Sequence, residues 1–425
     1  MQISSICKKR TKKNVKSTLK RQSKKKAEGI VFGKKGWRLL CSPTSDEGHI
    51  AVFGGSGSGK TTALLIPTLR AWRGTAFVVD ISGDISGEVQ NRSKVIFDPE
   101  NTGTIPYNVF YAVDNATDDD ERHERLNQIA FAVLPDIPQS NDAGKYYRES
   151  ARHMLQASLI AYYNAGLDFV GICKQVVGCS ATLLISDISA SNNEVAISLI
   201  SGIVGIQENN LSGIKQEVDK AISLFATSKK IENALRRTKE AISPAVLEKR
   251  SLYIRVEDEK LEIFTPLIRL LMMQTLTHLS TRKNKANPPV LLCLDEFASF
   301  GKLEILPALR KLRKKNVRVM LLTQSLADID LIYGKAERRA MLDNLSYKVV
   351  LSALETETQM YFSKLAGEKT VSRISVTKGE RGISESKTDV REPEIYPEEF
   401  GQLGDSLILF YHGGIERLKK NFFYK

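Results

Sequence analysis

Residues 54–61 read GGSGSGKT and come directly after the apolar run HIAVF at residues 49–53. The spacing G-x-x-x-x-G-K-[ST] is satisfied by Gly54, Gly59, Lys60 and Thr61. The apolar run predicts a buried strand, and residues 60–72 predict a helix that a proline kinks or ends. A strand, a glycine-rich turn and a helix in this order indicate an α/β fold whose turn holds phosphate groups.

The residue types in this loop suit the phosphate chain of ATP and its Mg²⁺ ion. Glycines let the backbone turn tightly and direct its N–H groups at phosphate oxygens, and the following helix N-terminus adds partial positive charge. Lys60 is expected to reach the β- and γ-phosphates, and the Thr61 hydroxyl to ligate Mg²⁺. A Ser/Gly linker is the alternative, and a dinucleotide loop is disfavoured because the spacing G-x-G-x-x-G is missing. The predicted nucleotide-binding residues are Gly54, Gly55, Ser56, Gly57, Ser58, Gly59, Lys60, Thr61 and Thr62.

A second segment, VLLCLDE at residues 290–296, places two carboxylates after an apolar strand. In an open parallel sheet, ligands bind beside the carboxyl ends of the strands. Asp295 is therefore predicted to hold Mg²⁺ through its water shell, and Glu296 to polarise the water that attacks the γ-phosphate. Two surface carboxylates that simply close a strand are the alternative, which the phosphate loop makes the weaker one.

Further candidates follow this acidic pair. The apolar run at residues 318–323 predicts another strand, and Gln324 after it is either a sensor of the γ-phosphate or a turn residue. One face of a basic helix between the two strands would meet a neighbouring subunit as an arginine finger, and another would meet DNA phosphates. A solvated helix face is the alternative for each member of this basic run, which comprises Arg310, Lys311, Arg313, Lys314, Lys315 and Arg318.

Strand and helix patterns alternate along most of the chain, which indicates a parallel α/β sheet. Residues 165–230 differ, because they carry helical patterns without clear strands. Polar and charged segments at residues 114–124 and 375–392 predict a surface loop and a mobile loop. The expected division is a basic flexible tail at 1–36, a nucleotide-binding domain from 37–164 and 231–425, and an all-helical insertion at 165–230.

The net charge is +13, and eleven Lys or Arg without any acidic residue fall within residues 1–26, which leaves about +2 for the rest. Such a segment is typical of an arm for nucleic acid or anionic lipid, or of a solubility tail. The five cysteines are scattered without a C-x-x-C pair, so neither zinc nor a disulfide framework is expected. Because no run of about 18 apolar residues occurs, we expect a cytoplasmic protein without a transmembrane helix.

Three stretches of the chain resemble the cytoplasmic ATPase part of type IV secretion coupling proteins, the motors that pump DNA in conjugation. They are GSGSGKTTALLIPTLRAWRGTAFVVDISGDI at 55–85, LLCLDEFASFGKLEILPALRKLRKKNVRVMLLTQSLADIDLIYG at 291–334 and NLSYKVVLSALETETQMYFSKLAGEKTVS at 344–372. The second stretch is the most specific, because it keeps the family's spacing from the acidic pair to Gln324 and on to Tyr333 and Gly334.

The resemblance implies a RecA-like P-loop NTPase with a mostly parallel central sheet and an inserted all-helical subdomain. It also implies a homo-oligomeric ring, expected to be a hexamer, with ATP at the subunit boundaries. The implied catalytic residues are Lys60, Glu296, Gln324 and Arg313, of which Arg313 is the arginine finger. Thr61 and Asp295 are the implied magnesium ligands.

Three departures from the family accompany this resemblance. Ser82 stands before Gly83 where the family usually has Lys, and Asn108 is followed by Val109 rather than by Pro. The family generally begins with transmembrane helices, and none is evident in this sequence. A separate membrane protein is therefore expected to recruit the chain, or the basic tail holds it peripherally at the inner face of the cell membrane.

The predicted function is ATP hydrolysis coupled to translocation of single-stranded conjugative DNA, with its relaxase, to a type IV secretion channel. Recognition of the DNA is expected to have little sequence specificity. One alternative is a cytoplasmic DNA translocase for chromosomes or for genome packaging. Another is a nucleotide-gated adaptor that docks the relaxase and hydrolyses little ATP.

Overall fold

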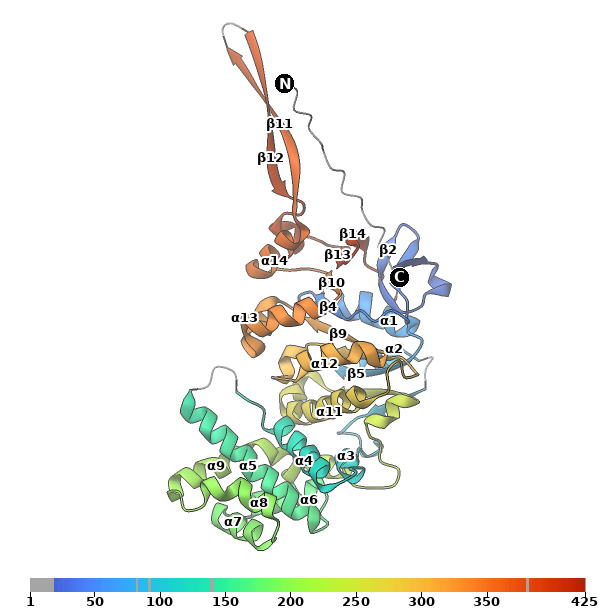
Figure 1. Cartoon of the computed structure of the whole chain (residues 1–425). Helices are drawn as coiled ribbons and strands as arrows, with labels where there is room; N and C mark the ends of the chain where they lie inside the picture. The colour runs from blue at the N-terminus through green and yellow to red at the C-terminus, as the bar shows by residue number, and fades with distance from the viewer. Residues whose placement is uncertain (1–18, 82, 91–92, 138–140, 380–381, 425) are drawn as a thin grey trace, which may run out of the picture.

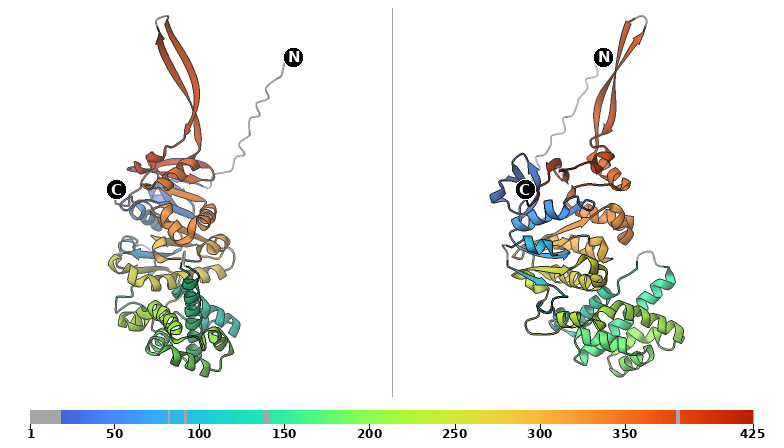
Figure 2. Two further views of the ribbon diagram at one scale, coloured as in Figure 1. Left: turned by 90° about the vertical axis from the view of Figure 1, so that its left-hand side faces the viewer. Right: turned by 180° about the vertical axis from the view of Figure 1, so that it is seen from behind.

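The computed structural model describes residues 19–81, 83–90, 93–137, 141–379 and 382–424. The chain is elongated, with a large sheet and its covering helices in the middle (Figure 1). A lobe made of helices lies at one end, and a two-stranded hairpin stands at the other. Figure 2 shows the same arrangement from the side and from behind, so the lobe and the hairpin occupy opposite ends of the molecule.

The described strands of the middle part form one sheet in the order β1-β3-β2-β14-β13-β10-β4-β9-β8-β5-β7-β6. Neighbouring strands from β10 to β6 run parallel, whereas those from β1 to β10 pair antiparallel. The bounds are β1 (Lys20–Gln22), β2 (Ile30–Lys35), β3 (Arg38–Ser42), β4 (Ile50–Phe53), β5 (Thr75–Ile81), β6 (Lys94–Phe97), β7 (Ser251–Val256), β8 (Val290–Leu294), β9 (Val317–Thr323), β10 (Tyr347–Val350), β13 (Ser406–Tyr411) and β14 (Gly414–Lys419).

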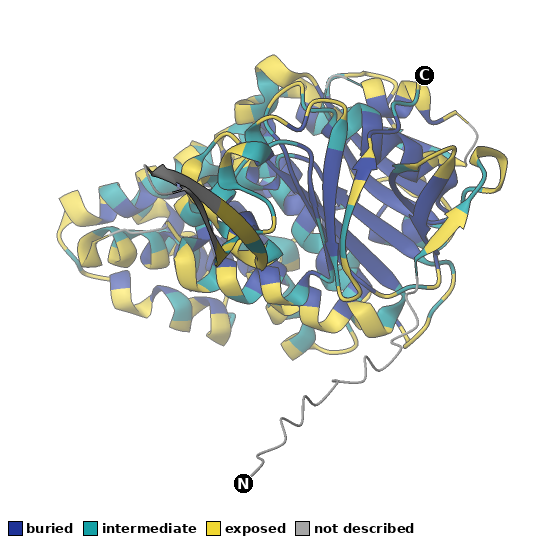
Figure 3. Cartoon of the chain, turned by 90° about the horizontal axis from the view of Figure 1, so that it is seen from above, coloured by how far each residue is buried: buried dark blue, intermediate teal, exposed yellow. Residues whose placement is uncertain are grey.

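Both faces of the central strands are buried, as expected for a parallel sheet covered by helices. Along β4, Ala51 and Phe53 join one apolar cluster while Ile50 and Val52 join another, because successive side chains point to opposite faces. Figure 3 shows these strands as a buried layer. The predicted α/β class with a mostly parallel sheet is therefore confirmed.

The helices and short helical turns of this part lie between the strands in sequence. They are η1 (Lys24–Lys26), η2 (Lys60–Leu65), α1 (Ile66–Ala71), α2 (Asp84–Glu88), η4 (Pro244–Glu248), η5 (Asp258–Lys260), α11 (Leu261–Thr281), η6 (Phe297–Phe300), α12 (Ile305–Leu312), η7 (Arg313–Lys315), α13 (Leu326–Asn344), α14 (Thr356–Ala366) and η8 (Pro397–Gly401). Pro67 is the second residue of α1, just after η2 passes directly into this helix.

The helical lobe is built from helices with well-defined starts. Asp118, Asn141 and Asp168 each accept a hydrogen bond from a backbone N–H in the first turn of the helix that follows. Such capping satisfies one of the unpaired N–H groups at a helix start. The lobe contains α3 (Tyr111–Asp114), α4 (Asp119–Val133), α5 (Asp142–Asn164), α6 (Phe169–Gly178), α7 (Ala181–Ala190), α8 (Glu194–Ile200), η3 (Ser201–Ile203), α9 (Glu208–Thr227) and α10 (Lys229–Ala234).

The lobe begins earlier in the chain than the sequence indicated. The expectation of a loop at residues 114–124 is wrong from Asp119 onward, because the acidic residues there occupy the first turn of α4, where they favour the helix N-terminus. The chain enters and leaves the lobe beside a single parallel bridge between Tyr107 and Ile242. We therefore propose that the helical insertion extends from α3 to α10 rather than over residues 165–230 alone.

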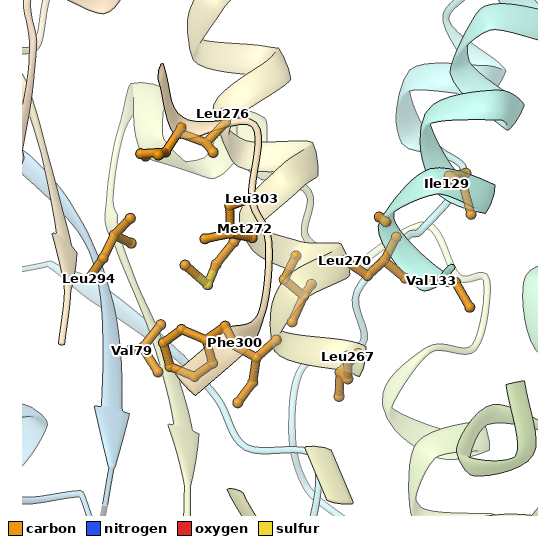
Figure 4. Close-up of a cluster of buried hydrophobic side chains, with 14 of the residues drawn as sticks. Val79, Ile129, Val133, Leu267, Leu270, Met272, Leu276, Leu294, Phe300 and Leu303 are labelled. Atoms are coloured by element: carbon orange, nitrogen blue, oxygen red, sulfur yellow. The ribbon is translucent and has the colours of Figure 1, made fainter. Parts of the chain in front are cut away.

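One continuous apolar core joins the sheet to the lobe. Val79 of β5 and Leu294 of β8 face α11, and Leu270 on α11 lies toward Ile129 and Val133 of α4 (Figure 4). Since these side chains belong to one buried cluster, the helical lobe packs firmly against the sheet through α11.

Two further expectations are corrected by the strands. The expected mobile loop at 375–392 belongs to a hairpin of β11 (Glu368–Gly379) and β12 (Gly382–Pro393), which pair in register along their whole length. Its polar composition hid the strand pattern. The expected tail at 1–36 includes β1, η1 and all of β2, while residues 1–18 and Ser82 lie outside the described residues. Among the described residues, no helix combines the length and the apolar character that crossing a membrane requires.

Candidate nucleotide-binding site

The loop after β4 folds back tightly before η2 begins. Gly59 has a φ of 96°, a left-handed conformation that disfavours residues with a Cβ atom. A Cβ atom on Gly54 would lie 2.3 Å from Ser58 Oγ, so a larger residue there would have to displace this hydroxyl. Ser56 and Gly57 are exposed at the top of the loop, which leaves that surface open to a ligand.

Neighbouring strands hold this loop in place. The Gly54 N–H donates to the Thr323 carbonyl of β9 over 3.1 Å, and the Gly55 N–H donates to Ser352 Oγ over 3.1 Å. Ser352 follows β10, the other neighbour of β4. The sequence did not single out Ser352, and the only signal for it is a hydroxyl residue just after the apolar run at residues 349–351.

The structure brings Lys60 and Glu296 together. Lys60 Nζ lies 3.0 Å from Glu296 Oε1 and donates to the Gly54 carbonyl over 2.7 Å. Glu296 has φ 48° and ψ 41°, an uncommon conformation for a residue with a Cβ atom, and such outliers concentrate at functional sites. The ammonium group is therefore buried within the loop and faces a partly exposed carboxylate.

Thr61 and Asp295 form a second pair beside the first. The Thr61 hydroxyl donates to Asp295 Oδ2 over 3.2 Å, and the Glu296 N–H donates to Asp295 Oδ1 over 3.1 Å. The sheet explains this meeting, because β4 and β8 both pair in parallel with β9 and end at the same edge. Residues more than 230 positions apart, 61 and 295, thus come into contact.

The electrostatics of the site suit a phosphate chain with a divalent cation. Burial raises the pKa of Asp295, and the nearby Glu296 charge raises it further, whereas Lys60 and the Thr61 bond lower it. A hydroxyl and a carboxylate oxygen at this spacing are the hard oxygen donors that Mg²⁺ prefers. The Ser58 hydroxyl is buried without a hydrogen-bond partner among the described residues, and a phosphate oxygen would supply an acceptor.

Gln324 lies at the same edge of the sheet. It directly follows β9, the strand between β4 and β8, and its side chain is exposed. Its place between the phosphate loop and the acidic pair suits contact with a γ-phosphate.

Arg313 lies at the opposite end of the parallel strands, where their amino ends meet. It begins η7, just before the amino end of β9, and its side chain is exposed. Its charge acts on His49, which precedes the amino end of β4. The length of the strands therefore separates Arg313 from the phosphate loop of its own chain.

One member of the basic run is not on the surface. Arg318 is fully buried in β9, where its guanidinium bonds to the Gly48 and Pro43 carbonyls and to Ser42 Oγ. The expectation that Arg318 meets solvent, a neighbouring subunit or DNA is wrong, because β9 is a central strand buried on both faces.

A family model described as "Type IV secretory system Conjugative DNA transfer" matches residues 1–425 of this chain. The match covers the whole sequence, including the sheet, the helical lobe and the hairpin. The family predicted from the three sequence stretches is thereby confirmed.

Curated relatives are similar at low identity over most of the chain. Protein VirD4 of Rhizobium rhizogenes is 24% identical over 406 residues, which cover 89% of this chain and 59% of that protein. The coupling protein VirD4 of Bartonella quintana is 23% identical, with coverage of 84% and 59%. The conjugal transfer protein TraG of Rhizobium radiobacter is 25% identical, with coverage of 88% and 62%. The chain spans about three fifths of the length of these relatives.

Solved structures share the fold. The bacterial conjugative coupling protein TrwB lacking its N-terminal segment has a TM-score of 0.74 at 20% identity, covering 92% of this chain and 87% of that one. TrwB bound to the ATP analogue ADPNP has a TM-score of 0.73 at 20% identity, covering 92% and 89%. VirB4 of Thermoanaerobacter pseudethanolicus is more distant, with a TM-score of 0.51 at 12% identity and coverage of 92% and 96%. The expected RecA-like architecture is therefore confirmed.

Proposed function

The chain belongs to the type IV secretory system conjugative DNA transfer family, and from that premise we propose that it is an ATP-hydrolysing motor for conjugative DNA. It would move single-stranded DNA, with its relaxase, toward a type IV secretion channel. The observation that carries the enzymatic part is the contact of Lys60 in the phosphate loop with Glu296, at 3.0 Å. The relatives named as coupling and conjugal transfer proteins support the part that concerns DNA.

The proposed chemistry divides among five side chains. Lys60 exchanges its contact with Glu296 for the β- and γ-phosphate oxygens of ATP. Mg²⁺, held by Thr61 and Asp295, would supply neutralisation of the phosphate charge. Glu296, released from Lys60, then orients the attacking water and accepts its proton. Gln324, at the same edge, is proposed to sense the γ-phosphate.

Arg313 is proposed to act on the nucleotide of a neighbouring subunit. Because the sheet separates it from its own phosphate loop, it suits an arginine finger only in an assembly of several copies. This agrees with the proposal of a homo-oligomeric ring, for which a hexamer is expected. Peripheral attachment at the inner face of the cell membrane, or recruitment by a membrane protein, is proposed as the cellular setting.

The first test is ATP hydrolysis by the purified chain with and without single-stranded DNA. We expect DNA to stimulate hydrolysis, most strongly at low salt where phosphate contacts are strongest. Glu296→Gln should bind ATP but hydrolyse it about 10²- to 10³-fold more slowly, because the base is lost. Glu240→Gln, at an exposed carboxylate in the turn before η4, is the matched control. Wild-type hydrolysis by Glu296→Gln would refute the assignment of Glu296.

The second test addresses what the motor serves. If the chain moves conjugative DNA, Glu296→Gln should abolish mobilisation of the transferred element while leaving chromosome segregation unchanged. The reverse result would favour a chromosomal translocase. Mobilisation that survives Glu296→Gln would favour an adaptor that docks the relaxase without needing hydrolysis.

A further inference from the structure

We propose that Phe422 and Tyr424 form a platform on which the base of the bound nucleotide stacks. This inference rests on the proposed function, because it assigns a further part of the same nucleotide site. Residues 422–423 lie against the first turn of the helix that carries Lys60, and this contact is the starting observation. Neither residue belongs to a motif that the sequence analysis singled out.

The order of strands gives the direction of the nucleotide. β4 carries the phosphate loop, and β8 with its acidic pair lies two places to one side. Residues 420–424 continue from β14, which belongs to the strands on the other side of β4, beyond β10 and β13. A phosphate chain with its γ end at Glu296 and Lys60 therefore points its nucleoside end toward residues 420–424.

Direct contacts place these residues at the loop. The Phe423 N–H donates to the Thr62 carbonyl over 3.0 Å. A Cβ atom on Gly59 would lie 3.2 Å from Phe422 Cε1, so the edge of this ring rests against the glycine that precedes Lys60. Thr62 closes the predicted phosphate-binding set, on the side where the α-phosphate and the ribose would leave the loop.

The segment is held rather than loose. The Lys420 N–H donates to the Asp405 carbonyl over 2.8 Å, and Asn421 is only 4% exposed. The guanidinium of Arg70, on α1, lies 5.0 Å from the centre of the Phe423 ring. Because both sides of Phe422 are fixed in this way, its position against the phosphate loop is built into the fold.

The two proposed rings form an aromatic surface in which Phe422 is half-buried and Tyr424 is exposed. The ring centres of Phe422 and Tyr424 lie 5.5 Å apart, and the angle between the ring planes is 31°. The Tyr424 residue is 61% exposed. An exposed ring beside a phosphate loop offers a face to a planar base, and stacking of bases on aromatic rings contributes to nucleotide affinity. Stacking does not read hydrogen-bonding edges, so ATP and GTP should bind alike and pyrimidine nucleotides more weakly.

The test compares ATP with inorganic triphosphate, which has the phosphates but no base. Equilibrium titrations with each ligand and Mg²⁺ would be made on the full chain, on Tyr424→Ala and on Phe422→Ala. We expect each variant to weaken ATP binding about tenfold and to leave triphosphate binding within twofold. Tyr424→Phe should bind ATP as the wild type does, because it keeps the ring. Trp37→Ala removes another exposed aromatic ring, in the turn between β2 and β3, and should change neither affinity.

Two outcomes would overturn the platform. Equal weakening of ATP and triphosphate in both variants would mean that residues 420–424 only support the loop, and unchanged ATP affinity would mean that the base lies elsewhere. Lys60→Ala separates this proposal from the function on which it rests, because it should weaken both ligands. If Lys60→Ala binds triphosphate as the wild type does, the proposed nucleotide site itself fails.

Discussion

The carboxyl ends and the amino ends of the parallel strands each hold a cation beside a carboxylate. The two cations differ in whether a ligand can reach them. At the carboxyl edge, Lys60 pairs with Glu296 at 3.0 Å, and the Glu296 side chain is 28% exposed. At the amino edge, Arg318 faces Asp46 at 3.7 Å, and the Arg318 side chain is 2% exposed. The first pair is open to a ligand, while the second is sealed inside the protein.

The partners of each cation explain the difference. Arg318 is surrounded by the fixed acceptors of the chain itself, including the Gly48 carbonyl at 2.8 Å, and burial lowers its pKa to about 10. Lys60 is held by the loop carbonyls of Gly54 at 2.7 Å and Gly55 at 3.5 Å, and by a carboxylate that phosphate oxygens are able to replace. The comparison teaches that a buried cation suits ligand binding where its partners can be exchanged, whereas Arg318, held by fixed acceptors, offers nothing to a ligand.

The largest effect is expected at the carboxyl edge, for Lys60→Ala. ATP hydrolysis should fall about 1000-fold, or about 4 kcal/mol, because charge that develops on the phosphates loses its closest cation. The free energy of unfolding should change by less than about 1 kcal/mol, since Glu296 remains partly solvated. Steady-state kinetics and urea unfolding measure the two quantities.

Lys145→Ala, at an exposed position on α5, is the control for this experiment. It should leave both quantities near their wild-type values. A Lys60→Ala protein that is greatly destabilised would place this pair in the same structural class as Arg318, and the comparison would fail.

The next effect is expected at the amino edge, for Arg318→Met. The free energy of unfolding should fall by about 3 kcal/mol, because Asp46 and several buried acceptors lose their charged partner. Nucleotide affinity measured on the remaining folded protein should not change. Arg310→Met on the exposed face of α12 is the matched control, and an equally stable Arg318→Met protein would show that the buried network contributes little.

A pH dependence of stability is predicted at the same edge, from His49. Burial lowers the pKa of His49 to about 4, and the charges of Arg318 and Arg313 lower it as well. The Val319 N–H donates to His49 Nδ1, so the imidazole is required in its neutral form. The unfolded chain binds the proton more readily, and this stabilisation is therefore complete above about pH 6.5 and is lost as the pH falls toward 4.

Urea unfolding of wild type and His49→Gln at pH 7.5 and pH 5 measures the contribution of neutral His49 to the free energy of unfolding. The wild type should lose about 2 kcal/mol more than His49→Gln over this interval. His412→Gln, at an exposed imidazole, should behave like the wild type. Equal losses for wild type and His49→Gln would indicate that His49 titrates normally in the folded protein.

The smallest effect is expected for Ser352→Ala, which removes the hydroxyl that accepts from the Gly55 N–H. Nucleotide affinity should fall about fivefold, or about 1 kcal/mol, because one hydrogen bond that holds the loop is lost. Isothermal titration with ATP measures the change, and Ser189→Ala on the exposed face of α7 is the control. An unchanged affinity would mean that the backbone bond from Gly54 to β9 suffices.

Much of the site was predictable because its parts are short and local. The phosphate loop is a pattern of eight consecutive residues, and the acidic pair directly follows an apolar strand. The contact between Gly55 and Ser352 joins residues 297 positions apart, and no local pattern marks it. The same holds for Phe422 against Gly59, since that contact exists only because β14 returns to the sheet beside β13.

Local chemistry in the sequence determined the glycine-rich loop after one strand, the two carboxylates after another strand and the alternation that makes a parallel sheet. Only the tertiary structure decided that Lys60 meets Glu296, that Arg318 is sealed, and that aromatic residues lie against the loop. The physical reason is that spacing along a chain sets the conformation of a segment, whereas the order and register of strands set which segments meet.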